Sequence, residues 1–181
     1  VSLSNEVYTA SECFYPGHTG EPIQISTHRT CIGGPIGNLY GFHAVDVSDD
    51  GEWIITDSLG ANPHLYGDGS SDDRMVIGNG VPDFYLAWNN AVEWKSFDLN
   101  VNMRGAFGHQ IINFGRLYYE NLNNTQYNML KSAFNPVYGK TLDYPLTYVD
   151  YYVEDGDYWK VDNATLGYTF NAQNLPGFLA Q

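Results

Sequence analysis

The sequence predicts an all-β protein built from antiparallel strands and hairpins. The 181 residues include 15 tyrosines, nine phenylalanines and four tryptophans beside 19 glycines. Aromatic residues favour strands, and glycine marks the turns between them. Residues 84–107 add a second observation, because apolar and polar side chains alternate along two successive arms. Secreted sandwiches, carbohydrate-binding surfaces and outer-membrane barrels share this composition, which does not choose between them.

The charge balance excludes two classes of partner. The chain carries 8 basic and 21 acidic side chains, for a formal net charge of -13. Nucleic-acid and anionic lipid surfaces demand clusters of Lys and Arg, so neither partner is expected. The two cysteines, Cys13 and Cys31, are too few for a disulfide-dense scaffold. They fit either one bridge or two unrelated thiols.

The first third of the chain predicts short strands joined by turns. Residues 21–30 read as an extended segment, and the glycines of residues 31–38 predict a tight turn. Strands are expected at residues 38–47 and 52–56, with a hairpin turn at residues 48–51. Residues 57–81 are polar and glycine-rich, which predicts an exposed loop. A calcium site at its acidic residues is the alternative, although the spacing is not that of an EF-hand.

Residues 84–107 predict a hairpin with one apolar face and one polar face. Apolar side chains occupy even positions in the first arm, and odd positions after a tight turn at Lys95 and Ser96. Each arm has about 11 residues, the length of a tilted membrane strand. Aromatic residues at the arm ends fit an interfacial girdle. A half-buried hairpin of a soluble sandwich has the same alternation, and the pattern alone slightly favours the soluble protein.

The last third predicts one helix and one long strand. Tyr127, Leu130 and Phe134 recur at helical spacing between a capping residue, Asn124 or its neighbour, and Pro136, which predicts a short amphipathic helix. Residues 158–170 predict a strand. Its apolar parity changes along its length, which indicates a bulge near Asn163.

No catalytic motif is present, and the sequence predicts a protein that is not an enzyme. Nucleophile-elbow, P-loop and zinc-helix patterns are missing from the sequence. The five histidines never lie three or four residues apart, so no local metal pair forms. Residues 154–157 are acidic, but such a run is far more often a turn than a glycosidase pair. No cofactor is expected, apart from the Ca²⁺ considered above for the acidic loops.

Several motifs, in order along the chain, resemble the C-terminal part of the barrel in SusC/RagA-family TonB-dependent transporters of Bacteroidetes. These motifs are GGPIGNLYG at 33–41, VIGNGVPDFY at 76–85, WNN at 88–90, FDLNV at 97–101, MRGAFG at 103–108, LYYEN at 117–121, LKSAF at 130–134 and YYVEDGDYWKVDNATLGYTF at 151–170. Each motif alone is weak evidence for the resemblance. The ordered set, and the last motif above all, is specific for this family.

The resemblance implies a segment of a 22-stranded barrel in the bacterial outer membrane, with loops at the cell surface. The family imports glycans, oligosaccharides or peptides with a SusD-type lipoprotein, and TonB energises uptake through a box near the N-terminus. Residues 1–181 contain neither the plug nor that box, and end before the last strands expected of the family. The chain is therefore expected to be a single segment of the barrel.

The resemblance also implies an orientation of the hairpin in the membrane. The short turn at Lys95 and Ser96 is expected to face the periplasm, and the connection of residues 108–157, with its short helix, the outside. The polar parity then points into the lumen. The lumen or substrate-facing candidates are Glu93, Asp98, Asn100, Asn102 and Arg104.

The alternative is a free-standing carbohydrate-binding β-sandwich module, in which exposed Trp and Tyr rings stack on sugars. The sugar-stacking candidates are Trp53, Tyr118, Tyr119 and Trp159. Solubility separates the two hypotheses, because a module is monomeric in water whereas a barrel segment needs detergent or neighbouring strands.

Overall fold

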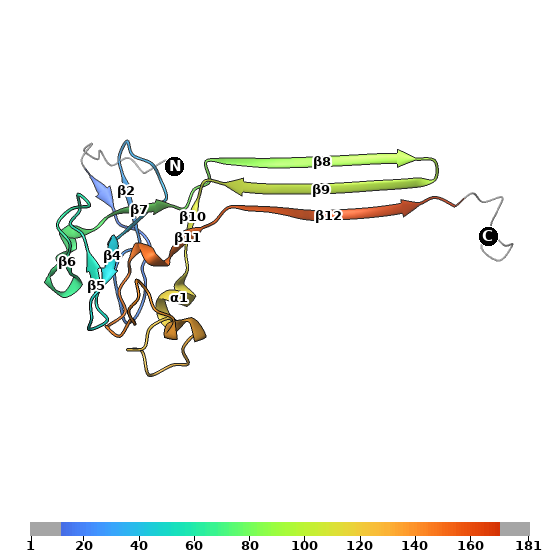
Figure 1. Cartoon of the computed structure of the whole chain (residues 1–181). Coiled ribbons are helices and arrows are strands. Elements are labelled where there is room, and N and C mark those ends of the chain that lie inside the picture. The colour runs from blue at the N-terminus through green and yellow to red at the C-terminus, as the bar shows by residue number, and fades with distance from the viewer. Residues whose placement is uncertain (1–11, 171–181) are drawn as a thin grey trace. The chain divides into compact units, whose positions relative to one another are not determined.

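The computed structural model describes residues 12–170, which form two compact units (Figure 1). The described residues of one unit, Val1–Val81 with His109–Gly156, are here called the loop body. Those of the other unit, Pro82–Gly108 with Asp157–Gln181, are called the long sheet. No helix among the described residues is long and apolar enough to cross a membrane.

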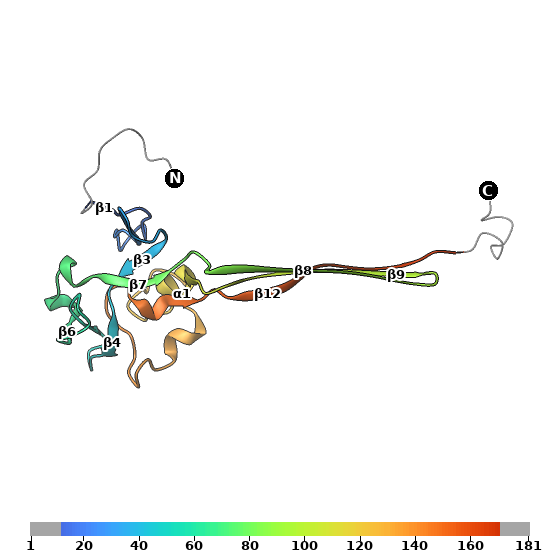
Figure 2. The same ribbon diagram turned by 90° about the horizontal axis from the view of Figure 1, so that it is seen from above.

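The long sheet consists of three antiparallel strands in the order β12-β9-β8. They are β8 (Phe84–Trp94), β9 (Phe97–Phe107) and β12 (Tyr158–Tyr168), each 11 residues long. Figure 2 shows them edge-on as a single layer. Trp94 pairs with Phe97 across the two-residue turn, where Lys95 has a φ of 57°. The predicted hairpin and the predicted last strand are confirmed.

The register gives the long sheet two chemically different faces. On one face Val92, Leu99 and Leu166 lie side by side on the three strands. On the other, Glu93 is paired with Asp98. A bulge in β12 keeps its apolar and polar side chains on the matching faces of the sheet. Val161 pairs with Met103, and Asn163, two residues further on, pairs with Asn102, the next residue of β9. Asp162 is the extra residue, so the predicted bulge is confirmed.

Aromatic rings form a row at each end of the apolar face. Phe107 stacks on Phe84, with ring centroids 5.2 Å apart, and Trp159 adjoins it at 6.4 Å. At the other end Phe97 contacts Tyr168 at 4.7 Å. Phe97 and Phe107 are separated by about 33 Å of strand at about 3.3 Å per residue. A tilt of about 40° reduces this to about 25 Å, the height of the apolar band of a membrane barrel.

Among its described residues, the loop body contains three small antiparallel sheets and one short α-helix. The first sheet joins β1 (Cys13–Phe14), β2 (His28–Cys31), β3 (Asn38–Gly41) and β7 (Met75–Asn79). The second joins β4 (Ala44–Val47), β5 (Trp53–Ile55) and β6 (His64–Leu65), and the third joins β10 (Gln110–Ile112) and β11 (Val153–Asp155). The helix is α1 (Phe114–Tyr119). The 3-10 helices are η1 (Tyr66–Asp68), η2 (Ser71–Asp73), η3 (Lys131–Phe134) and η4 (Asp150–Tyr152).

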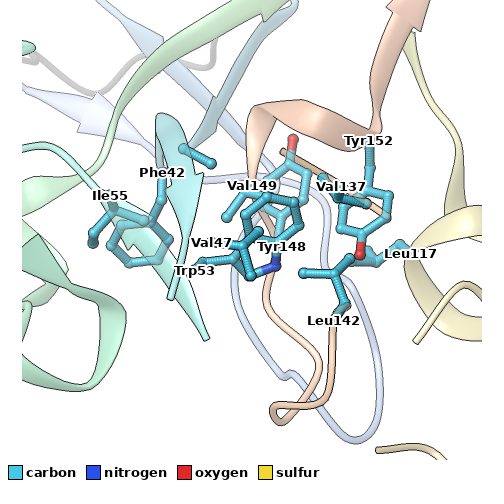
Figure 3. Packing of buried hydrophobic residues seen from close by; sticks show 11 residues of the cluster. Phe42, Val47, Trp53, Ile55, Leu117, Val137, Leu142, Tyr148, Val149 and Tyr152 are labelled. Atoms are coloured by element: carbon cyan, nitrogen blue, oxygen red, sulfur yellow. The ribbon is translucent and has the colours of Figure 1, made fainter. Parts of the chain in front are cut away.

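The core of the loop body is aromatic and draws on both of its chain segments (Figure 3). Trp53, from the first segment, is only 1% exposed and packs against Tyr151 and Tyr152 from the second, with ring centroids 5.3 and 6.1 Å away. Tyr148 and Leu117 are fully buried in the same cluster. Because the two segments share one core, neither can bury its apolar side chains without the other.

Some predicted elements of the loop body are wrong. The helix expected at residues 124–136 is absent, and only η3 forms there. Tyr127, Leu130 and Phe134 are 64%, 40% and 66% exposed, so a helix at this position has no buried face to stabilise it. The short helix is instead α1, where the Asn113 side chain accepts a hydrogen bond from the Arg116 amide as an N-cap.

The expected strand boundaries also differ in the first third. Residues 38–47 divide into β3 and β4. The extended segment of residues 21–30 begins with a turn, and only its end belongs to β2. Residues 57–81 contain β6, η1, η2 and β7 in place of an irregular loop. Pairing with strands distant in sequence, such as β7 on β3, organises these short segments.

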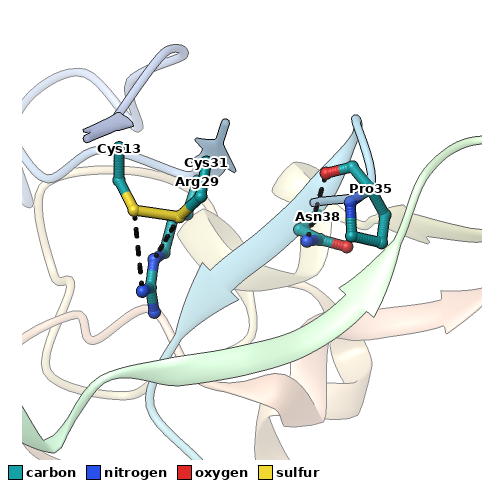
Figure 4. The surroundings of a disulfide bond; sticks show 5 residues. All are labelled: Cys13, Arg29, Cys31, Pro35 and Asn38. Carbon is teal, nitrogen blue, oxygen red and sulfur yellow. Dashed lines mark hydrogen bonds between the residues drawn. A yellow bond between two sulfur atoms is a disulfide. The ribbon is translucent and has the colours of Figure 1, made fainter. Parts of the chain in front are cut away.

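Cys13 and Cys31 form a disulfide that joins β1 to β2 (Figure 4). The side chain of Arg29 lies beneath it, with Nε 3.2 Å from the Cys31 sulfur. The choice between a bridge and two thiols is thus settled in favour of the bridge. Disulfides persist in oxidising compartments, which include the periplasm and the cell surface.

Candidate functional site

The polar face of the long sheet gathers the lumen candidates. Glu93 of β8 lies opposite Asp98 of β9 in the strand register. Asn100, Asn102 and Arg104 follow on the same face of β9. Lys160, Asn163 and Thr165 of β12 lie beside them. The structure therefore brings all five residues together on one face. Their contact with a substrate stays a prediction.

Asp162, the bulged residue, is held by the cations of this face. Its carboxylate lies 2.8 Å from the Arg104 Nε and 3.2 Å from the Lys160 Nζ. The Arg104 side chain is 58% exposed, so this ion pair contributes about 1 kcal/mol or less. The two contacts hold the Asp162 carboxylate against the cations of the polar face.

The apolar face of the long sheet is uncovered within residues 12–170. Leu86, Val92 and Leu99 are 51%, 50% and 42% exposed, although they lie in the middle of regular strands. A soluble sandwich packs a second sheet on such a face at a distance of about 10 Å. Residues 12–170 place no second sheet there, so these residues do not form the sandwich alternative.

A cavity of about 770 Å³ lies in the loop body and is here called the tyrosine groove. Its lining combines aromatic rings, amide side chains and a single charged residue. The lining residues are Glu21, Pro22, Tyr118, Tyr119, Asn123, Asn124, Thr125, Gln126, Tyr127, Pro145 and Leu146. The groove thus contains two of the sugar-stacking candidates, Tyr118 and Tyr119, at the end of α1.

The rings of the groove divide into one anchored and two open tyrosines. Tyr118 donates its hydroxyl to the Thr19 carbonyl, and burial followed by the charge of Glu21 raises the pKa of this phenol. Tyr119 and Tyr127 are 43% and 64% exposed, and their rings meet edge to face with centroids 6.5 Å apart. Tyr118 therefore fixes the wall, while the other two rings present free surface.

The other two sugar-stacking candidates are placed elsewhere. Trp53 lies in the core of the loop body, so its prediction as an exposed platform is wrong. Trp159 pairs with Gly105 on the apolar face of the long sheet, where a β-carbon on residue 105 would lie 2.6 Å from the indole. This ring lies over a glycine on the apolar face and is 46% exposed, and its contact with a sugar stays a prediction. Tyr127 was missed because its spacing suggested a helix face.

Charged side chains fix α1 in the loop body. The Arg116 guanidinium contacts Glu120 at 2.6 Å and Glu154 at 2.7 Å, and Asn113 donates to the same Glu154 carboxylate at 3.1 Å. The hydrogen bonds from Arg116, and then from Asn113, lower the pKa of Glu154. This network ties the helix that carries Tyr118 and Tyr119 to strand β11.

No metal centre is evident in the described part of the chain. Residues 12–170 contain no group of three or more His, Cys, Asp or Glu side chains arranged to hold an ion. In residues 57–81, the segment of the alternative calcium site, the Asp57 carboxylate accepts hydrogen bonds from the Leu59 and Ala61 amides.

Comparisons with known proteins agree with the resemblance. No protein-family model matches the chain. TonB-dependent receptor P3 of Formosa agariphila is 31% identical over 179 residues, which is 89% of this chain and 17% of that protein. The solved structure of the RagAB peptide importer in its open-open state has a TM-score of 0.62 at 16% identity, over 95% of this chain and 19% of that chain. The chain thus spans about a fifth of the length of these relatives. The expected likeness to a SusC/RagA-type barrel segment is confirmed.

Proposed function

We propose that this chain, as a segment of a SusC/RagA-type TonB-dependent transporter, forms part of an outer-membrane nutrient importer. In this proposal the long sheet is a stretch of the barrel wall, with its apolar face toward lipid and its polar face toward the lumen. The observation that carries the proposal is the uncovered apolar face bounded by two aromatic rows. We propose lipid as the partner of this face, since soluble proteins rarely leave a contiguous apolar patch exposed to water and membrane barrels expose such a band to lipid.

The topology of the chain supports an orientation for this segment. The turn at Lys95 and Ser96 has two residues, whereas all passages between the long sheet and the loop body lie at the opposite end of the strands. Barrels of this class have short periplasmic turns and long extracellular loops. The loop body is then extracellular, and its disulfide fits an oxidising environment.

The edges of the long sheet support continuation of the wall. Strands β8 and β12 each pair with β9 alone among the described residues. An unpaired strand edge in hydrocarbon costs several kcal/mol for each unsatisfied backbone group, so both edges need neighbours. In the proposed importer these neighbours are further strands of the same barrel.

The proposed partners are a SusD-type lipoprotein above the loops and TonB on the periplasmic side. The relative named as a TonB-dependent receptor supports the second partner, and the likeness to RagAB supports an importer with a lipoprotein component. The proposed cargo is a glycan, an oligosaccharide or a peptide. We place the protein among transporters and not among enzymes.

The test labels the full-length transporter in whole cells. Leu59, 88% exposed in the loop body, and Ser96 in the turn are each replaced by cysteine. A membrane-impermeant maleimide is expected to label Leu59→Cys on intact cells, and Ser96→Cys only after the outer membrane is permeabilised. Labelling in the reverse order overturns the orientation. Recovery of the protein from the soluble fraction overturns the proposal as a whole.

A further inference from the structure

The tyrosine groove has unused binding capacity. Tyr119 and Tyr127 both line it and are 43% and 64% exposed. The side chains of Asn123 and Gln126 make no hydrogen bond to any residue of the described chain. A primary amide offers two donors and an acceptor oxygen, so these side chains can exchange water for hydroxyl groups of a ligand.

The walls of the groove are fixed before any ligand arrives. The Leu130 amide donates to the Tyr119 carbonyl at 2.8 Å, which closes the loop of residues 120–129 back onto α1. Asn124 donates its side-chain amide to the Tyr118 carbonyl at 3.0 Å. A preformed site loses less conformational entropy on binding, which favours affinity for a weakly interacting ligand.

Charge in the groove distinguishes the classes of ligand. Glu21 is its one charged lining residue, and neither Lys nor Arg contributes to the wall. A uronate, a sulfate ester or the carboxylate of a peptide would meet no cation, and would face the field of a protein with a net charge of -13. The groove therefore disfavours anionic ligands.

The aromatic rings and amide side chains of the groove fit a neutral sugar. A neutral sugar presents an apolar face of C–H groups, which packs on an aromatic ring, and a rim of hydroxyls, which hydrogen-bond to amides. The volume of about 770 Å³ lies in the upper part of the usual range for small-molecule sites and leaves room for more than one sugar ring.

We infer that the tyrosine groove binds uncharged saccharide units, with Tyr119 and Tyr127 as the stacking surface and Asn123 and Gln126 as hydroxyl ligands. The inference rests on the proposed function for the location of the groove at the cell surface. It makes the groove a capture point for neutral oligosaccharides on the loop body.

The experiment uses the full-length transporter purified in detergent. Short unsubstituted gluco-, manno-, galacto- and xylo-oligosaccharides are titrated by calorimetry, beside oligogalacturonate and a mixed peptide library. At least one neutral oligosaccharide is expected to bind, and Tyr119→Ala to weaken it about tenfold or more, which corresponds to about 1.4 kcal/mol. Tyr119→Phe keeps the ring and is expected to keep the affinity. Phe134→Ala, which removes an exposed ring outside the groove, is the matched control.

Three outcomes overturn the inference. They are the lack of binding by any neutral oligosaccharide, an affinity that Tyr119→Ala leaves unchanged, and peptide or oligogalacturonate binding that depends on Tyr119. The cysteine labelling described above is run on the same variants. Correct labelling with any of these outcomes removes the saccharide site and leaves the importer, whereas incorrect labelling removes the importer itself.

Discussion

Arg116 shows how single side chains hold the loop body together. Its guanidinium bridges Glu120, which is 5% exposed, and Glu154, which lies at the surface of β11. Loss of Arg116 would leave the buried Glu120 carboxylate without its cation, which is the costly way to break such a pair. The helix that carries two groove tyrosines therefore depends on one charged residue behind it.

Glu154 makes the stability of this region depend on pH. Because the pKa of Glu154 is lowered in the folded protein, its contribution is present above the unfolded value, about 4.3, and is lost as the pH falls through the folded value. Glu154→Gln is expected to speed amide hydrogen exchange in α1 a few-fold at pH 7, since a partly exposed pair contributes up to about 1 kcal/mol. The difference from the wild type should vanish in acid. A difference that stays unchanged as the pH is lowered from 7 through the acid range would contradict this assignment, and Glu93→Gln in the long sheet is the control.

Exposure of single aromatic residues could not be predicted from the sequence. Trp53 and Tyr119 are both large aromatic residues flanked by mixed neighbours, yet one is buried and the other lines a groove. Burial of Trp53 is decided by Tyr151 and Tyr152, about a hundred residues away along the chain. Contacts of this range leave no mark in local sequence patterns.

At the scale of elements, the hairpin was predictable because its signals are local. Period-two alternation assigns the faces, and the change of parity at Lys95 and Ser96 locates the turn. The helix expected near Leu130 failed because helical spacing is necessary but not sufficient. A short helix forms only where its apolar stripe is buried, and here the stripe is exposed.

The two faces of β9 predict opposite effects of a charge. Val101 lies near the middle of the strand on the apolar face, and Asn102 is its neighbour on the polar face. Val101→Arg is expected to cost about 2–4 kcal/mol, because in the proposed barrel wall it places a cation in lipid, and so to reduce the folded, heat-modifiable transporter in outer-membrane fractions. Asn102→Arg and Arg104→Ala should leave that amount unchanged. Equal losses for the two faces would show that the assignment of faces is wrong.

At the scale of the whole chain, the two units interleave in the sequence. The loop body is assembled from residues before and after the hairpin, and the core of Figure 3 holds these segments together. Motif order along the chain predicted the barrel segment, but not that its connections form one packed body. That outcome depends on pairing between segments such as β10 and β11, more than forty residues apart.

The exposed face and edges of the long sheet predict how the 181-residue chain behaves alone. Without detergent or neighbouring strands it is expected to aggregate, because apolar side chains and unpaired backbone groups both face water. Replacing Leu86, Val92, Leu99 and Leu166 together by Ser should reduce this aggregation, as measured by light scattering. A monomeric chain in plain buffer would contradict the proposed membrane wall.

The bulge at Asp162 has a consequence for how the gene can change. Removing the codon for Asp162 leaves Trp159, Val161, Ala164, Leu166 and Tyr168 at uniform two-residue intervals, so every one of them keeps its side of the sheet. Removing the codon for Asn100, in a strand that is regular against β8, turns one half of β9 over and so exchanges residues between the apolar and the polar face. A single-residue deletion at Asp162 thus preserves the two faces of the long sheet, whereas one at Asn100 disrupts them.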